Sequence, residues 1–273
     1  TGMRNNFLEE WKFQPLLLLI FNFLFFSATF ALKVPEDCAS SVGEWDEQTR
    51  VCTLKQDLKD LQGKTGIEIT TSSITLDCNG HTISGNAGVG IEVISKDNIT
   101  IKQCKIEGFS LGMNAQMNNN FQLENNIFEN NRVAAYILDC PSIQVKENVF
   151  QNNQVASQVY WSEGCFFSEN KFEENQLGLL LRSPNCTLTQ NEFLKNQYNF
   201  GINYVFEIGY ESKYFRHQID PSNTINGKPI YYLVDKENIT IPPDASFVGV
   251  VNSKNITIEN LKLENNWQSI LVF

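Results

Sequence analysis

The chain has 273 residues and a formal net charge of −10. It contains no basic patch, which argues against nucleic acid as a partner, and its acidic surface disfavours polyanionic ligands unless calcium bridges them. With two histidines, His81 and His217, and no CxxC spacing, the sequence indicates no zinc or copper site and no cofactor.

The first 31 residues have the pattern of a secretory signal peptide. Arg4 and Lys12 precede the apolar run 16–26, and a Thr-Phe-Ala sequence at 29–31 offers a small-residue cleavage site. The apolar run is too short to span a bilayer comfortably. We therefore predict that residues 1–31 are removed, and that the mature chain has no transmembrane span and is secreted, held at the cell surface or periplasmic.

Residues 32–65 are predicted to form an N-terminal cap. Cys38 and Cys52 enclose a loop of 15 residues, and in an exported chain we expect them to form a disulfide, which the chain-entropy model values at roughly 3 kcal/mol. The run VCTLKQDL (51–58) has the alternation of an amphipathic strand. Such a strand would cover the open edge of the following domain, where unpaired backbone would promote aggregation.

A unit of about 22 residues recurs in the domain that we assign to residues 66–273. The clearest copies are LENNIFENN (123–131), VKENVFQNN (145–153), FSENKFEEN (167–175) and LTQNEFLKN (188–196). They place Phe128, Phe150, Phe172 and Phe193 in one column, which Ile106 and Ile83 extend towards the N-terminus. A fixed period this short indicates a solenoid, in which neighbouring coils complete one another's core.

Apolar and polar residues alternate with a period of two inside each unit, as they do in strands. One series of inward pairs is Ile91/Val93, Met113/Ala115, Ala135/Ile137, Ser157/Val159 and Leu179/Leu181. A second series is Ile99/Ile101, Phe121/Leu123, Ile143/Val145, Cys165/Phe167 and Cys186/Leu188. Together with the Ile and Phe column, these series make three short strands per coil. We therefore predict an all-β, right-handed, single-stranded parallel β-helix of the pectin-lyase-like type.

Two columns of asparagine accompany the strands. They comprise Asn126, Asn148, Asn170 and Asn191, and Asn131, Asn153, Asn175 and Asn196. Asparagine tolerates the left-handed backbone of a sharp corner, and stacked amides can bond one another. The columns could therefore be buried amide ladders or rows of identical solvent-facing residues.

Cys165 and Cys186 share an inward position on adjacent coils, and they could form a disulfide or pack as free thiols.

The period is interrupted over residues 203–250, which are rich in aromatic residues and proline. We predict that this segment leaves the stack as a loop and returns through NITIPP (238–243). The coil pattern resumes at 251, where Ile270 and Val272 repeat the inward positions. Because the sequence stops in mid-coil, we expect the C-terminal part of the domain to be missing.

Several stretches resemble the NosD-type β-helix family of exported proteins. They are GIEITTSSITLDCNGHTISG (66–85), the coils that follow it, NTINGKPIYYL (223–233) and DASFVGVVNSKNITIENLKLENN (244–266). The resemblance covers roughly residues 50–273 and implies a carbohydrate-binding and sugar-hydrolysis domain. The founding member is associated with copper-site maturation of nitrous oxide reductase, but this chain shows no copper ligands and the resemblance does not carry that function over.

The predicted register also identifies outward side chains. Those with the chemistry of a sugar-binding face are Tyr136, Gln158, Tyr160 and Arg182, with Trp161 at a strand end. Aromatic rings pack on the apolar faces of pyranoses, while amides and guanidinium groups bond their hydroxyls. We predict that these five residues bind carbohydrate. Alternatively, they are ordinary surface residues or are covered by the 203–250 segment.

Two carboxylates are candidates for catalysis. Asp139 and Glu163 lie on adjacent coils, and a coil spacing of about 4.8 Å and about 3.3 Å per residue place their Cα atoms roughly 8 Å apart, which suits an inverting glycosidase. The polygalacturonase motifs and the RxPxxR of pectate lyases are absent, so the sequence leans against an enzyme. The alternatives to a carbohydrate-binding protein are a structural or adhesive surface protein and a polysaccharide hydrolase or lyase. The sequence does not define an oligomeric state.

Overall fold

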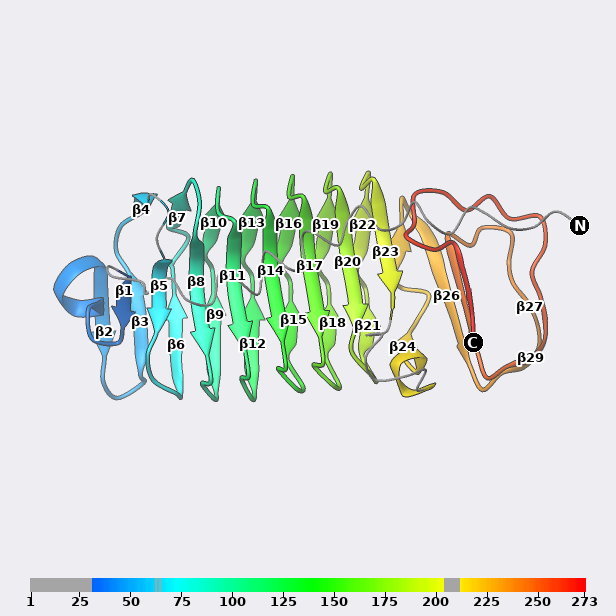
Figure 1. The fold of residues 1–273 in the computed structure, drawn as a ribbon, viewed down its shortest axis with the longest axis horizontal. Helices are drawn as coiled ribbons and strands as arrows, with labels where there is room; N and C mark the ends of the chain where they lie inside the picture. Colours follow the sequence, from blue (N-terminus) through cyan, green and yellow to red (C-terminus); the bar gives the residue numbers. More distant parts are fainter. Residues whose placement is uncertain (1–30, 62, 64, 204–211) are drawn as a thin grey trace, which may run out of the picture. The chain divides into compact units, whose positions relative to one another are not determined.

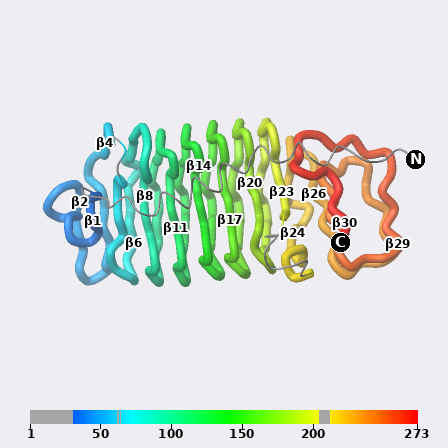
Figure 2. Tube along the Cα trace, viewed as in Figure 1, coloured from blue at the N-terminus to red at the C-terminus, as the bar shows by residue number. Residues whose placement is uncertain are grey.

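The computed structural model describes residues 31–203 and 212–273, except 62 and 64, so the predicted signal peptide falls outside the described residues apart from Ala31. Within the compact unit Ala31–Phe273, short strands wind into successive coils, and equivalent strands pair in parallel from coil to coil (Figures 1 and 2). The helical pieces among the described residues are a short π-helix, η3 (Cys38–Val42), and a 3-10 turn, η5 (Ser212–Phe215). The predicted all-β solenoid is confirmed.

The strands form three large sheets. The first sheet contains, in spatial order, β1 (Leu32–Val34), β5 (Thr65–Ile69), β8 (Val89–Ile94), β11 (Leu111–Gln116), β14 (Val133–Leu138), β17 (Val155–Tyr160), β20 (Leu177–Arg182) and β23 (Tyr198–Ile202). The second contains β2 (Gly43–Asp46), β3 (Val51–Leu54), β6 (Ile74–Asp77), β9 (Ile99–Lys102), β12 (Phe121–Glu124), β15 (Gln144–Lys146), β18 (Phe166–Ser168), β21 (Thr187–Thr189) and β24 (Gln218–Ile219).

The third sheet contains β4 (Leu58–Leu61), β7 (Thr82–Gly85), β10 (Lys105–Glu107), β13 (Ile127–Glu129), β16 (Val149–Gln151), β19 (Lys171–Glu173), β22 (Glu192–Leu194), β25 (Thr224–Ile225), β26 (Lys228–Val234), β28 (Phe247–Val251) and β30 (Ile270–Val272). A separate pair joins β27 (Glu237–Thr240) to β29 (Lys254–Thr257). Each central coil therefore contributes one strand to each large sheet.

In the regular coils the core follows the register that the period predicts. On β30 the prediction is wrong, because Ile270 and Val272 are exposed and Leu271 packs against the core. On the first sheet Met113 pairs with Ala135, and Ala135 with Ser157, so the inward residues lie in one column. On the third sheet the rings of Phe128, Phe150, Phe172 and Phe193 stack with centroids 5.1, 5.0 and 4.7 Å apart. All four phenylalanines are fully buried. Each coil thus supplies one layer of a continuous apolar core.

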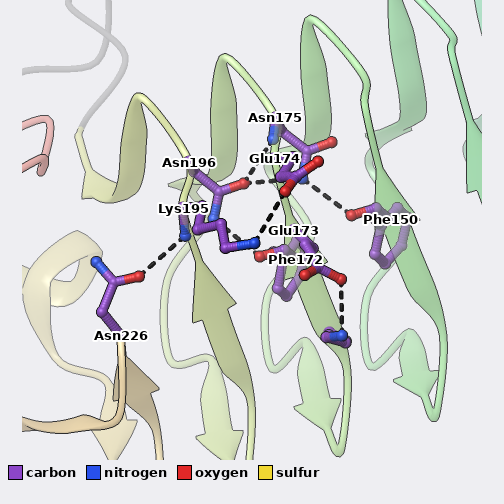
Figure 3. Close-up of polar contacts among 9 residues, drawn as sticks. Phe150, Phe172, Glu173, Glu174, Asn175, Lys195, Asn196 and Asn226 are labelled. Carbon is purple, nitrogen blue, oxygen red and sulfur yellow. Dashed lines mark hydrogen bonds and ion pairs between the residues drawn. The ribbon is translucent and has the colours of Figure 1, made fainter.

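Both asparagine columns are buried ladders, which decides between the two interpretations of the sequence. Asn148 shows the pattern: its Oδ1 accepts hydrogen bonds from the backbone N–H of Asn126 (2.9 Å) and the Asn126 amide (3.0 Å), and its own amide donates to the Leu123 carbonyl at 2.7 Å. Figure 3 shows the second ladder, where the Asn175 backbone N–H and side-chain amide both donate to Asn196 Oδ1 at 2.9 Å. The ladders satisfy backbone groups that the corners would otherwise leave unpaired.

A third buried ladder lies at another corner. The sequence period did not predict it, because its residues differ in type. It runs through Asn118, Cys140, Ser162 and Ser183, all fully buried. The Lys96 backbone N–H donates to Asn118 Oδ1 at 2.9 Å, and the N–H groups of Cys140 and Ser162 donate to the hydroxyls of Ser162 and Ser183, both at 3.0 Å. The position needs an acceptor rather than a particular residue.

Much of the segment that we expected to leave the stack belongs to it. Residues 204–211 lie outside the described residues, but β24 pairs with β21 and β25 with β22. Ile219 and Ile225 continue the apolar columns, and Asn223 continues the first amide ladder with a bond to Asn191 at 2.8 Å. The sequence separation within that bond is 32 residues instead of 22, so a search at fixed period misses the coil.

Three disulfides link the coils and the N-terminal segment. The predicted Cys38–Cys52 bond is present, and Cys165–Cys186 is a disulfide rather than a thiol pair. The third bond, Cys78–Cys104, was not predicted. Its signal is that both cysteines closely follow the strand-end residues Asp77 and Lys102, which pair on adjacent coils. Cys140 is a buried free thiol, and burial raises its pKa.

We expect peptide mapping of unreduced, exported protein to recover three linked peptides, joining Cys38 to Cys52, Cys78 to Cys104 and Cys165 to Cys186. Alkylation should label Cys140 only after unfolding, because its side chain is fully buried. Disulfides persist in oxidising compartments, which fits an exported protein. Free thiols at all six paired positions in folded, exported material would contradict both the pairing and the compartment.

Candidate functional site

The outward face of the first sheet carries the residues that the sequence singled out. β-pairing aligns Tyr136 with Gln158, and Leu138 with Tyr160. On the next coil Tyr160 aligns with Arg182. We call Tyr136, Gln158, Tyr160, Trp161 and Arg182 the outward stripe. Its register is the predicted one.

The exposure of the stripe differs from the prediction. Tyr136, Gln158 and Tyr160 are 8%, 7% and 8% exposed, so the interpretation of Tyr160 as solvent-facing is wrong. Side chains on neighbouring coils pack against one another: the Tyr136 and Tyr160 rings lie 5.7 Å apart, and the Arg182 guanidinium lies 5.2 Å from the Tyr160 centroid. Arg182 Nη1 also donates to the Tyr160 hydroxyl at 3.3 Å. Burial raises the pKa of Tyr136 to about 12, so its phenol stays protonated.

Trp161 is the accessible member of the stripe, with 40% of its surface exposed. It lies at a left-handed corner directly after β17, with φ of +51°. Asp139 and Met117 occupy the same corner on the two preceding coils, since the Asp139 backbone N–H donates to Tyr160 O and that of Met117 to Leu138 O. Met117, Asp139 and Trp161 therefore form an exposed column, which we call the corner column.

The corner column ends at Trp161 because the next coil is one residue shorter. Tyr160 pairs with Arg182, which is 22 residues later, whereas the Ser162 backbone N–H bonds Ser183 Oγ, which is 21 residues later. No residue of the next coil corresponds to Trp161. The indole therefore has no counterpart on the next coil.

The two candidate carboxylates, Asp139 and Glu163, differ in their surroundings. Asp139 is exposed and lies one coil from Trp161 in the corner column. Glu163 aligns instead with Pro141, because the backbone N–H of Ser142 donates to Glu163 O at 2.8 Å, and Glu163 Oε1 accepts a 2.8 Å hydrogen bond from Asn185 Nδ2. Asp139 is thus exposed one coil from Trp161, while the Glu163 carboxylate is hydrogen-bonded to Asn185.

The sequence matches the family described as "Right handed beta helix region" over residues 48–193. The chain belongs to this family. No curated protein matches the sequence. The match ends at Phe193, on the last coil before the longer spacing that leads to Asn223.

Within the described part of this right-handed β-helix, no group of three or more His, Cys, Asp or Glu is placed to hold a metal ion. No helix in the same described residues is long and apolar enough to cross a membrane.

Of the predicted binding residues, the right-handed β-helix leaves Trp161 exposed and packs Tyr136, Gln158 and Tyr160 against neighbouring coils. The grouping of Trp161 with Met117 and the end of their column at the short coil were not predicted from the sequence. The signal was available, because the fourth phenylalanine of the column follows after 21 residues rather than 22.

Proposed function

We propose that this β-helix binds carbohydrate at the corner column, with Trp161 as the stacking platform. The observation that carries the proposal is an exposed indole at the end of a column, one coil from an exposed carboxylate. Indole rings pack well on the apolar faces of sugar rings, and a carboxylate accepts hydrogen bonds from the hydroxyls at the sugar rim. One coil spacing, about 4.8 Å, separates the backbones of Trp161 and Asp139.

The other stripe residues support the platform. Tyr160 precedes Trp161, and the Tyr136 ring and the Arg182 guanidinium pack against Tyr160. This packing limits the side-chain rotamers available at the end of β17, next to Trp161. It therefore reduces the conformational entropy that is lost when a ligand binds. Tyr136, Tyr160 and Arg182 act as positioning residues, and Trp161 and Asp139 make the contact.

The disulfides bear on the cellular location of the protein. We propose a protein that is secreted, held at the cell surface or periplasmic, where three disulfides would persist. We also propose that the chain belongs to the NosD-type subgroup. The sequences NGKPIYY (226–232) and NITIENLKLENN (255–266) support this assignment.

Replacing Trp161 by alanine is expected to raise the Kd for a bound glycan by about 10–100-fold, or about 1.4–2.8 kcal/mol. The glycan would first be found by screening the expressed protein on an array with and without calcium, and its Kd measured by calorimetry. Because Trp161 is 40% exposed, the melting temperature should change little. Trp267→Ala is a matched control, since Trp267 is equally exposed but packs edge-on against Tyr198 at 5.9 Å.

Glycan binding that survives Trp161→Ala would place the site elsewhere. A large loss of stability in that variant would make Trp161 a packing residue. If no glycan binds the unaltered protein in either condition, the structural or adhesive alternative is favoured instead.

A further inference from the structure

A polar hollow of about 360 Å³ opens at the corner between the third and first sheets. It lies over residues 108–110 and 130–132, at the opposite end of the first-sheet strands from the corner column. The residues that line it include Asn86, Ser110, Asn130, Arg132, Asn152 and Gln154. We call this hollow the corner slot.

One coil lacks a side chain at this corner. Asn130 and Asn152 occupy a left-handed outward position, with φ of +56° and +55°, and the equivalent residue one coil earlier is Gly108, with φ of +82°. A Cβ at Gly108 would collide with the carbonyl oxygen of Gly85, so a side chain cannot stand there. The stack of corner side chains therefore stops at Asn130, at the edge of the slot.

Farther along the stack, the side chains at the same corner pair with one another. Glu174 and Lys195 follow Asn130 and Asn152 in the column, and Lys195 Nζ lies 3.1 Å from Glu174 Oε1 (Figure 3). The Lys195 backbone N–H also bonds Asn226 Oδ1 at 2.9 Å. In the slot, by contrast, the amides of Asn130 and Asn152 have no side-chain partner among the described residues.

Arg132 supplies an unpaired positive charge at the wall of the slot. Its backbone N–H donates to Phe109 O at 2.9 Å, which fixes its place on the coil. In the part of the chain that the structure describes, its guanidinium makes no ion pair or hydrogen bond, whereas those of Arg50, Arg182 and Arg216 bond Ser73 O, Tyr160 and Asp235. The nearby Glu107 and Glu129 are paired instead with Lys105, at 2.8 and 3.0 Å.

We propose that the corner slot binds a sugar acid, with its carboxylate on Arg132 and its hydroxyls on the amides of Asn130, Asn152 and Gln154. A guanidinium recognises a carboxylate through two parallel N–H donors. Each amide offers both donors and an acceptor, as a hydroxyl-rich ligand requires. A ligand with one carboxylate fits better than a polyanion, because the chain as a whole carries a charge of −10. This site is independent of the function proposed at Trp161.

The test is titration of the expressed protein with D-glucuronate, followed by ligand-observed NMR or calorimetry. Arg132→Gln should raise the Kd for glucuronate about tenfold or more while leaving any weak binding of D-glucose unchanged. Arg216→Gln removes the same charge far from the slot and should have no such effect. Binding should weaken as salt is added, and Trp161→Ala should leave it unchanged.

A change on the ligand side keeps the test valid if Arg132→Gln folds poorly. The methyl ester of D-glucuronate lacks the charge and should bind the unaltered protein about tenfold or more weakly than glucuronate. Equal binding of acid and ester, equal losses in Arg132→Gln and Arg216→Gln, or no glucuronate binding at millimolar concentration would each overturn the proposal.

Discussion

Replacing Phe150 by alanine is expected to lower the free energy of unfolding by about 3–5 kcal/mol. The ring is fully buried and stacks between Phe128 at 5.1 Å and Phe172 at 5.0 Å. Its removal loses the transfer energy of a large apolar side chain and leaves a cavity that two fixed coils cannot fill. Urea denaturation, monitored by circular dichroism, measures the change in the free energy of unfolding.

Ile127→Ala provides the control for the core, because Ile127 immediately precedes the phenylalanine column on β13 and is 39% exposed. Its replacement should cost well under half as much as Phe150→Ala. Similar losses in the two variants would mean that the inward register is incorrect.

Replacing Asn148 by alanine is expected to cost about 3–5 kcal/mol, although the side chain is polar. Its Oδ1 accepts two hydrogen bonds from Asn126, and its amide donates to Leu123 O and to Lys146 O, at 2.7 and 3.0 Å. Alanine would remove the acceptor of the buried Asn126 backbone N–H and the amide donor to the Leu123 carbonyl, and each buried group that loses its partner costs about 1–3 kcal/mol. Thermal and urea unfolding of the variant measure the loss.

Gln144→Ala is the matched control for the ladder, because Gln144 is an exposed amide on β15 in the same coil. We expect it to change the free energy of unfolding by less than about 0.5 kcal/mol. A small loss for Asn148→Ala as well would indicate that the ladder orders the corner without stabilising it.

Features that repeat with the coil could be predicted from the sequence. The Phe column and the inward pairs recur at one spacing, and burial on one face fixes the register of a strand. The predicted Cys38–Cys52 disulfide also needed only proximity in the chain and an oxidising compartment. The repeat thus predicted the fold and the direction of each stripe side chain.

Features that depend on contacts between unlike residues could not be predicted. The third ladder combines an asparagine, a cysteine and two serines, because only an acceptor is required. Tyr160 points outward as predicted, yet it is buried by Tyr136 and Arg182 on the adjacent coils. The slot brings together Gly108, Arg132 and Gln154 from several coils, and the repeat alone does not show that they line a hollow.

The most direct test of carbohydrate binding at the corner column is the side-chain N–H resonance of Trp161 during titration with a glycan retained in the screen. The resonance is assigned by its loss in Trp161→Ala, and the tryptophans Trp45 and Trp267 serve as internal references. We predict that the Trp161 signal shifts with the ligand while those of Trp45 and Trp267 stay in place. A bound glycan that shifts Trp267 or Trp45 and leaves Trp161 unchanged would contradict the proposed site.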